Sequence, residues 1–480
     1  MILGDGGRGP TLDDVFRRAG VSHPHALALV DPPDCEAIVG RAPRALTFSQ
    51  ADRAIAAFAA TLRGLGLHAD TVVGLQLPNT VESVIAFLGV LRAGMIAAPL
   101  PLLWRQRDLV DALGRAGAKV IVTCGRVGDV RHTELAMQVA AELFPIRYVC
   151  AFGSDEADGV VPLDPIFQDQ TAHASPAPHR EQPGAHVAAL TFETRADGLC
   201  LFARSHGQLI AAGSKFAAEC ALARDAALLS TVPLSSLAGL SASLVPWLLG
   251  GGTLHLHHGF AAETFAAQCQ ALEGGAVIVP AAILPLITGS LGTAGGVIAL
   301  WRAPERMQSA LPQRCGVVDI ACFGEAGLLL TQRDAHGAIL PLPFGHDTQR
   351  TRFGTLALRA TGTELDIFPP AENEAEVEGD PFFDTGFACQ ADADRGTLTI
   401  TGGPAGMSAI GGYRFARREL DSVLKAAAPD ATIATLPHAL LGERLAGKAP
   451  DPDRLERELT RQGLNPLLAM AFRPRGRAAG

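Results

Sequence analysis

The chain has 480 residues and a formal net charge of −9, with 48% hydrophobic and 19% charged residues. This is the balance of a globular protein, and the length exceeds what one hydrophobic core supports, so we expect two or more domains. The negative net charge, together with the lack of a basic run interleaved with aromatic residues, argues against nucleic acid as a partner.

The nine cysteines are scattered and include no C-x-x-C pair, so neither a zinc ribbon nor a redox motif is expected. Free thiols in a reducing compartment and an N-terminus without an apolar signal segment predict a cytoplasmic protein. Two uncharged segments, Ala226–Leu256 and Gly274–Leu300, are long enough to span a bilayer. Prolines and glycines interrupt both of them, so we expect buried core and no membrane span.

In chain order, the first part alternates apolar strands with helices. The helix expected at Ala51–Leu65 carries Ala54, Phe58 and Leu62 on one face. Such alternation predicts a parallel α/β sheet. The other elements expected in this part are a helix at Thr80–Ala93 and strands at Leu46–Gln50, Val72–Leu77, Met95–Ala98, Lys119–Thr123 and Ile146–Ala151.

A segment rich in proline, alanine and histidine, Thr171–Ala185, is typical of an exposed connector. Past Gly354 the alternation of apolar and polar residues predicts half-buried antiparallel strands. The elements expected after the connector are strands at Ala227–Pro233, Thr253–His257, Ala276–Pro280, Thr355–Arg359 and Thr397–Ile400, and helices at Arg418–Ala428 and Asp453–Arg461.

The stretch from Ala189 to Leu209 bears most directly on function. A buried strand, a loop, the pair Ser205-His206 and a helix form a frame that commonly surrounds a phosphate-binding loop, which needs glycines and a lysine. The predicted loop here, Glu193–Gly198, has one glycine, no lysine and two carboxylates that repel a triphosphate. The frame indicates a nucleotide enzyme, whereas the composition of the loop argues against one.

Further blocks carry a resemblance to a known family. They are the N-x-x-E run that opens Asn79–Gly94, the P-L…G-L…G-G-T run within Val232–Thr253, the start of a W-x-x-T-G-D run at Phe382–Gly386, and the G-G-Y run that opens Gly411–Asp421. With these blocks in order between Leu46 and Arg444, the chain resembles the adenylate-forming superfamily, particularly acyl-CoA synthetases.

The resemblance implies a large α/β N-terminal region of layered subdomains followed by a small, shortened α+β C-terminal domain. We expect the boundaries at residues 1–185, 186–403 and 404–480. The family uses ATP and Mg²⁺ to make an acyl-adenylate from a carboxylate and then passes the acyl group to coenzyme A. A mobile C-terminal domain serves the two steps in turn.

Several positions depart from the family's pattern. Phe192–Leu201, aligned without a gap, matches no residue of the phosphate-loop signature, and Gly402–Gly406 replaces the hinge motif G-R-x-K-D. Phe387 replaces the ribose-binding aspartate, and we expect it to stand where a ribose would sit. The chain ends at Gly480, and we expect the family's C-terminal lysine to be missing. Losing one phosphate-stabilising donor typically costs about two to three decades in rate.

The resemblance also marks candidate site residues. They are Glu325 at the Mg²⁺/ATP position, Thr194, Gly198, Gly324 and Thr385 for the nucleotide, Ser236, Gly239 and Leu240 for the acyl pocket, and Gly411 and Gly412 on the coenzyme A side. Glu325 could instead be a leftover carboxylate that caps a turn. His255 and His257 share one strand face without a nearby Cys, Asp or Glu, so we expect an edge strand there and no metal site.

Two functions remain open. The first is a catalytically impaired or inactive homologue, a pseudoenzyme of fatty acid metabolism that needs no cofactor. It would bind an acyl or acyl-CoA ligand, a partner protein or further copies of itself. The second is a divergent but active ATP-dependent ligase that uses ATP, Mg²⁺ and coenzyme A. In that case Thr194 and Arg195 would supply substitute donors at the phosphates.

Overall fold

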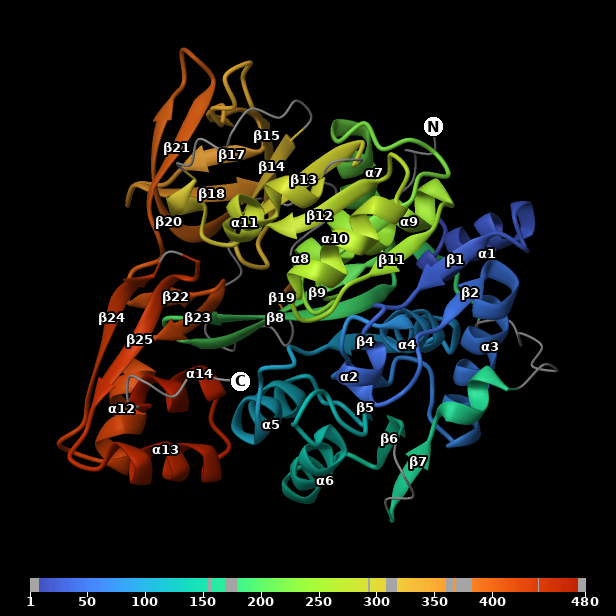
Figure 1. Cartoon of the computed structure of the whole chain (residues 1–480), viewed down its shortest axis with the longest axis horizontal. Coiled ribbons are helices and arrows are strands. Elements are labelled where there is room, and N and C mark those ends of the chain that lie inside the picture. Colours follow the sequence, from blue (N-terminus) through green and yellow to red (C-terminus); the bar gives the residue numbers. More distant parts are fainter. Residues whose placement is uncertain are drawn as a thin grey trace.

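The computed structural model describes residues 8–153, 158–168, 179–291, 294–307, 317–359, 366–367, 382–438 and 440–473. Two eight-stranded mixed sheets, a five-stranded antiparallel sheet and a small C-terminal part lie side by side (Figure 1). The layered mixed α/β architecture predicted from the sequence is thereby confirmed. Most of the predicted connector Thr171–Ala185 lies outside the described residues.

The first eight-stranded sheet has the predicted parallel strands at its centre. Its order is β19-β9-β8-β4-β3-β5-β6-β7, and β3 pairs in parallel with both β4 and β5. Its strands are β3 (Val72–Leu75), β4 (Ile96–Pro99), β5 (Val120–Cys124), β6 (Tyr148–Phe152), β7 (Val160–Pro162), β8 (Val187–Arg195), β9 (Gly198–Ser205) and β19 (Asp366–Ile367).

The helix α4 (Val81–Arg92) is buried along its whole length, because the core around it contains residues of both large sheets. Most of its side chains are apolar, as is typical of a helix in such a position. It packs on α3 (Phe48–Gly64), where a Cβ at Gly89 would lie 2.5 Å from the ring of Phe58. Other helices of the first half are α1 (Leu12–Ser22), α2 (Cys35–Val39), α5 (Gln106–Arg115) and α6 (His132–Glu142).

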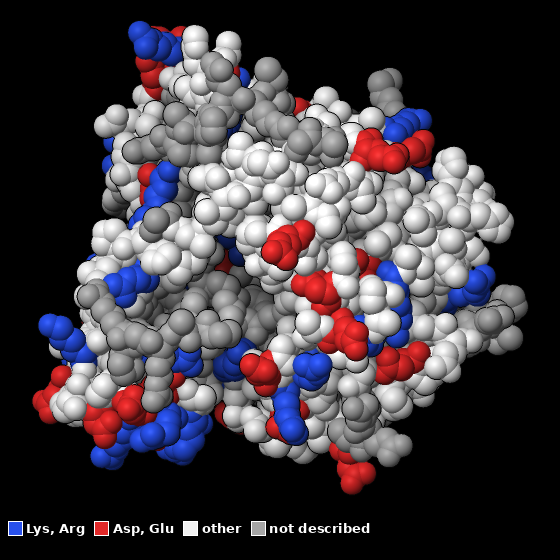
Figure 2. Space-filling view, viewed as in Figure 1, with Lys and Arg blue, Asp and Glu red and all other residues white. Residues whose placement is uncertain are grey.

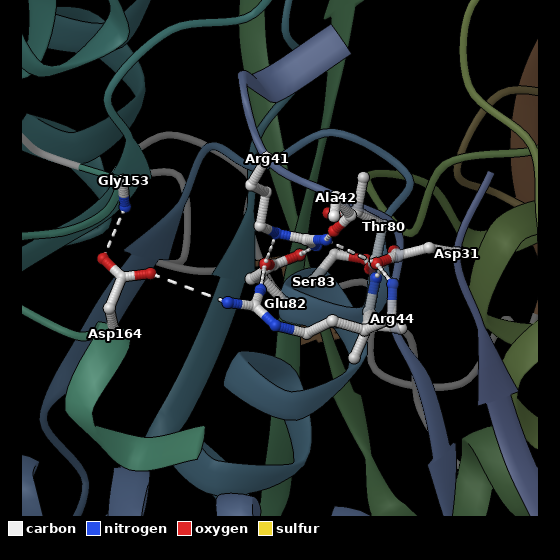
Figure 3. Close-up of polar contacts among 10 residues, drawn as sticks. Asp31, Arg41, Ala42, Arg44, Thr80, Glu82, Ser83, Gly153 and Asp164 are labelled. Carbon is white, nitrogen blue, oxygen red and sulfur yellow. Dashed lines mark hydrogen bonds and ion pairs between the residues drawn. The ribbon is translucent and has the colours of Figure 1, made fainter. Parts of the chain in front are cut away.

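A buried ion-pair network ties the N-terminal segment to α4 (Figure 3). Glu82 accepts hydrogen bonds from the guanidinium groups of Arg41 and Arg44. Asp31 accepts from Nη1 of Arg41 at 2.7 Å and from the backbone N–H groups of Arg44 and Val81, each at 2.8 Å. The glutamate of the N-x-x-E run therefore fixes architecture at the start of α4.

The second eight-stranded sheet is ordered β15-β14-β13-β12-β10-β11-β1-β2, so N-terminal strands join it at one side. The prediction of an edge strand at His255 and His257 is wrong, because β1 pairs with β11 and makes it interior. His257 is buried, and its Nδ1 lies 2.7 Å from Oε1 of Gln268. The strands are β1 (Leu27–Val30), β2 (Ala45–Thr47), β10 (Leu228–Ser230), β11 (Leu254–Leu256), β12 (Ala276–Pro280), β13 (Gly296–Trp301), β14 (Val317–Cys322) and β15 (Leu328–Gln332).

The two long uncharged segments supply strands and short helices of this half. Among the described residues, no helix has both the length and the apolar character needed to cross a membrane. The helices of this half are α7 (His206–Glu219), α8 (Leu237–Gly239), a π-helix (Leu240–Leu244), α9 (Val245–Gly250), α10 (Ala262–Ala271) and α11 (Leu284–Ile287).

The predicted loop Glu193–Gly198 is instead the tip of a β-hairpin. Strand β8 continues to Arg195, β9 starts at Gly198, and only Ala196 and Asp197 form the turn. Gly198 has a φ of +135°, a region that favours glycine. The interpretation as an open loop is wrong because both flanks of the turn pair along the hairpin up to Arg195 and Gly198.

The five-stranded sheet and the C-terminal part complete the molecule. The sheet is ordered β16-β21-β20-β18-β17, and the described residues of the C-terminal part form two β-hairpins, three α-helices and a short 3₁₀-helix (Met470–Phe472) around a core of their own. The strands and helices are β16 (Leu342–Pro343), β17 (Thr348–Arg350), β18 (Thr355–Arg359), β20 (Phe382–Asp392), β21 (Thr397–Gly402), β22 (Met407–Ile410), β23 (Tyr413–Ala416), β24 (Thr432–His438), β25 (Gly442–Lys448), α12 (Arg417–Ala427), α13 (Pro452–Arg461) and α14 (Pro466–Ala469).

The sheets do not divide at residue 185, since each eight-stranded sheet takes strands from both sides of that position. The C-terminal part begins with β22, and its strand β23 lies beside β8 of the first sheet (Figure 1). The C-terminal part and the β8–β9 hairpin therefore meet at one place.

On the face shown in Figure 2, the basic and acidic side chains of the described residues are interspersed.

Candidate functional site

A cavity of about 290 Å³ lies where β8, the turn after β14, the start of α8 and β23 come together. It contains five of the predicted site residues: Thr194, Ser236, Gly324, Glu325 and Gly412. Four segments far apart in the sequence thus converge on one space. The C-terminal part closes it from one side.

Glu325 is buried in the wall of this cavity. Its Oε2 accepts a hydrogen bond from the backbone N–H of Leu237 at 2.7 Å, so the carboxylate caps the first turn of α8. Its own backbone N–H donates to Oε2 of Glu193 at 3.1 Å, and the guanidinium of Arg204 donates to its carbonyl oxygen. Burial, with a contribution from Glu193, raises the pKa of Glu325 to about 7. Near neutral pH this carboxyl group therefore exists in both protonation states.

Glu193 projects from β8 over the turn that contains Gly324. A Cβ at Gly324 would lie 2.1 Å from Oε1 of Glu193, and the φ of Gly324 is +62°, so only glycine fits there without displacement. Nη1 of Arg414 lies 3.6 Å from the same Oε1. Burial raises the pKa of Glu193 and lowers the pKa of Arg414, and the attraction between the two opposes both effects. The result is a buried ion pair between the two parts of the chain.

Arg414 is a site residue that the sequence did not reveal. Its guanidinium lies 4.5 Å from the ring centroid of Phe387, and Nη1 makes no hydrogen bond within the described residues. Its partner Glu193 lies in a different part of the chain, and a single arginine in a short strand carries no recognisable signal. Arg414 places a positive charge at the wall where the C-terminal part meets the hairpin.

Phe387 and Thr385 do not line the cavity. Phe387 is fully buried in the core beneath the five-stranded sheet, with its ring edge-on to Phe323 at 5.2 Å. The hydroxyl of Thr385 donates to the carbonyl oxygen of Leu356 at 2.7 Å. The guanidinium of Arg414, rather than Phe387 itself, therefore borders the cavity at this side.

The remaining predicted residues lie around the cavity. A Cβ at Gly239 would be 2.0 Å from the carbonyl oxygen of Pro233, so this glycine permits a close backbone approach, and Leu240 is buried in the core. Gly198 borders a separate groove of about 510 Å³, which carries charged residues of both signs. Gly411 borders a second cavity and not the first.

This second cavity has a volume of about 660 Å³ and adjoins the first, since Pro233, Arg302 and Gly412 line both. Its walls are mostly apolar, and Arg306 and His438 add polar groups. Arg306 also forms an ion pair with Glu443 at 3.2 Å, which links the two parts of the chain. Together the two cavities follow the boundary between the N-terminal region and the C-terminal part.

The lining of the first cavity includes apolar side chains as well as Glu193 and Glu325. Leu77, Leu100, Phe192 and Ala238 are among them, and no lysine is among the lining residues. Burial lowers the pKa of His258, which also lines the cavity, to about 4, so this imidazole is neutral at physiological pH. Within the described ranges no three His, Cys, Asp or Glu side chains are grouped to hold a metal ion. The chemistry of the walls suits a ligand with an apolar body.

The family model for AMP-binding enzymes matches residues 16–192. Over these residues the chain is similar to AMP-binding enzymes.

Individual curated relatives are similar to parts of the chain. The chain is 28% identical over 284 residues to a 2-hydroxy-7-methoxy-5-methyl-1-naphthoate–CoA ligase of Streptomyces carzinostaticus, covering 58% of this chain and 49% of the relative. It is 24% identical over 229 residues to a medium-chain fatty-acid–CoA ligase of Escherichia coli K12, covering 47% of this chain and 40% of the relative. The matches thus span about half or less of the length of these relatives.

Two solved structures show the same fold over nearly the whole chain. The apo structure of MbtA from Mycobacterium smegmatis has a TM-score of 0.70 at 21% identity, covering 96% of this chain and 90% of MbtA. The amide bond synthetase McbA from Marinactinospora thermotolerans has a TM-score of 0.76 at 17% identity, covering 96% of this chain and 94% of McbA. At these identities the likeness concerns the fold alone.

Proposed function

We propose that this protein binds an acyl or acyl-CoA ligand in the two adjoining cavities without activating a carboxylate with ATP. The observation that carries the proposal is the buried Glu193 carboxylate, held between the backbone of Glu325 and Arg414. In an active relative, the resemblance implies a glycine-rich, lysine-bearing loop at this strand to hold a triphosphate. A buried carboxylate there opposes a polyanion instead.

The residues present do not fit MgATP. One oxygen of the Glu325 carboxylate already accepts from Leu237, and burial raises the pKa of this group to about 7. A carboxyl group that is partly protonated at neutral pH is a weak ligand for a hard cation such as Mg²⁺. The hairpin also closes with a turn of only two residues, Ala196 and Asp197, which is shorter than a glycine-rich phosphate-binding loop.

An acyl group fits the first cavity better than a nucleotide does, because its apolar side is built from aliphatic and aromatic side chains. The second cavity provides an apolar passage past Gly411 and Gly412 for the long arm of a thioester. Arg302 borders both spaces. Arg302 and Arg414, which both line the first cavity, would bind the polar end of the acyl group.

A second candidate is an active, divergent ligase. The observation that favours it is that Glu325, Thr194 and Ser236 border one cavity, and carboxylate and hydroxyl oxygens are suitable groups near a Mg²⁺-bound phosphate. This candidate requires MgATP to bind with measurable heat and that heat to disappear in Glu325→Ala. Absence of heat at millimolar MgATP would rule it out.

Calorimetric titration with dodecanoyl-CoA and, separately, with MgATP tests the proposal. We expect dodecanoyl-CoA to bind and MgATP to give no heat. Ser235→Trp, which places a large ring in the first cavity, should weaken dodecanoyl-CoA binding at least about tenfold, whereas Ser22→Trp on the exposed end of α1 should not. Failure of dodecanoyl-CoA to bind, or equal binding to both tryptophan variants, contradicts the proposal.

A further inference from the structure

Five consecutive residues, Leu100–Trp104, form a continuous part of the wall of the first cavity. This wall segment joins the end of β4 to the start of α5. The N–H of Leu100 still donates to the carbonyl oxygen of Leu75 in the sheet, at 2.8 Å, and the chain then turns away from the strand. Beyond that point the shape of the wall depends on contacts with side chains.

Gln76 supplies the main contact of this kind. It directly follows β3, and its Nε2 donates to the carbonyl oxygens of Pro101 at 3.1 Å and of Trp104 at 3.2 Å. The N–H of Trp104 donates to the same carbonyl oxygen of Pro101, at 3.2 Å, so one amide holds both ends of a tight turn. Gln76 itself is 1% exposed and does not border the cavity.

His132 fixes the orientation of the Gln76 amide. Its Nδ1 lies 3.1 Å from Oε1 of Gln76. Burial lowers the pKa of His132 to about 4, with smaller contributions from Arg105 and His258, so the imidazole is neutral near pH 7. Since Oε1 can only accept, Nδ1 carries the hydrogen. Both ends of the buried amide are therefore bonded, and such a network holds one geometry.

Trp104 stands between two spaces. It lines the first cavity and also the groove of about 510 Å³, and Thr194 is the other residue that both linings include. The ring of Trp104 packs edge-on against Phe192, with 5.6 Å between the ring centroids. It is 7% exposed, so a small part of its surface is open to these spaces. The ring therefore limits how far a ligand in the first cavity can extend toward the groove.

We propose that Gln76 is a positioning residue that sets the acyl selectivity of the first cavity, because it holds the wall segment and thereby keeps Trp104 as a barrier toward the groove. A wide acyl group needs the room that the Trp104 ring occupies, whereas a narrow linear chain does not. The selectivity rests on the proposed function, while the positioning of the wall segment requires no ligand.

The chain offers a matched control in Gln268 on α10. Its Oε1 lies 2.7 Å from Nδ1 of His257, and its Nε2 donates to the carbonyl oxygen of Leu256 at 2.9 Å. Gln268 is thus a second buried amide between a histidine and the backbone, but its partners do not line the first cavity. Changing either glutamine to methionine keeps the length of the side chain and removes the hydrogen bonds.

Calorimetric titration of the full chain with dodecanoyl-CoA and with 2-naphthoyl-CoA measures the selectivity as the ratio of the two dissociation constants. Trp104→Ala joins the cavity to the groove and should shift this ratio toward 2-naphthoyl-CoA by at least about tenfold. Gln76→Met should shift it in the same direction by at least about threefold. Gln268→Met should lower stability but leave the ratio unchanged, since a general loss of stability weakens both ligands alike.

Hydrogen exchange of the ligand-free protein, followed by mass spectrometry over Leu100–Trp104, tests the positioning directly. Gln76→Met should speed exchange in the wall segment at least about tenfold, whereas Gln268→Met should not. If the wild-type protein binds neither ligand, the proposed function fails, and the exchange rates alone decide whether Gln76 positions the segment. If it binds them and Gln76→Met changes the ratio and the exchange rate no more than Gln268→Met does, the inference is overturned and the proposed function stands.

Discussion

Two buried clusters of carboxylates and arginines in this molecule have opposite character. In the network around Glu82, both carboxylate oxygens accept hydrogen bonds from guanidinium groups, and Asp31 is equally well bonded (Figure 3). In the cluster around Glu193, the nearest guanidinium nitrogen is 3.6 Å away, and Nη1 of Arg414 makes no hydrogen bond among the described residues.

The difference separates a structural ion-pair network from the proposed binding site. A buried charge that is fully bonded within the protein stabilises one arrangement of the chain. A buried charge with an unused donor beside a cavity is a candidate for contact with a bound ligand. The first cluster belongs to a block that the chain shares with the family it resembles, whereas the second lies where the chain departs from that family.

The largest expected effect concerns the first cluster. Glu82→Gln removes a buried charge that two arginines share, and breaking such a pair costs about 3–5 kcal/mol. Urea denaturation of the variant should show a loss of this size in the free energy of unfolding. The control is Glu134→Gln, which breaks the exposed pair with Arg131 and should cost less than about 1 kcal/mol. If the two losses are equal, Glu82 does not have the structural role assigned to it.

The next effect is a pH dependence that arises in the second cluster. Burial raises the pKa of Glu325 from 4.5 to about 7, so between these values the folded protein keeps a proton that the unfolded chain has lost. Stability therefore falls as the pH rises through this window. At roughly 1.4 kcal/mol per pH unit, the full effect is about 3 kcal/mol.

The glutamine side chain of Glu325→Gln does not ionise, and its oxygen can still accept the hydrogen bond from the backbone N–H of Leu237. The advantage of the variant over the wild-type protein should grow by about 3 kcal/mol between pH 4.5 and pH 8, measured by urea denaturation at each pH. Glu36→Gln, at an exposed position, controls for the loss of a carboxylate. A difference between wild type and Glu325→Gln that stays constant with pH would show that Glu325 is not held in this environment.

The smallest expected effect concerns the space beneath Glu193. Gly324 and Gly396 both have a φ of +62°, but only at Gly324 would a Cβ meet Glu193, at 2.1 Å, since the nearest atom at Gly396 is 3.5 Å away. Each change to alanine should cost about 1 kcal/mol for the backbone, and Gly324→Ala should cost about 1–2 kcal/mol more. Adding Glu193→Ala should remove this excess. An equal cost at both glycines would mean that Glu193 lies elsewhere.

The sequence predicts the layered fold well, because strand and helix patterns are local. Its errors arise where the partner of a segment is distant. The composition of Glu193–Gly198 indicates an open loop, yet pairing with β9 extends β8 to Arg195. The pattern at His255 cannot show that β1, from the N-terminal part of the chain, covers that side of β11.

The site is harder to predict than the fold. Glu325, Gly324 and Ser236 follow from the resemblance, and all three border the first cavity. Arg414 does not, because its role depends on Glu193 in another part of the chain. Arg204 carries a signal that could have been used, a charged residue within the apolar run of β9, where a strand residue between buried neighbours must find a partner.

The most direct test of the central claim is ATP–pyrophosphate exchange with a panel of short, medium and long fatty acids and aryl acids. The account predicts no exchange above background with any acid, by the same preparation that binds dodecanoyl-CoA. Robust exchange with any acid on the panel would contradict it and would identify the protein as an active ligase.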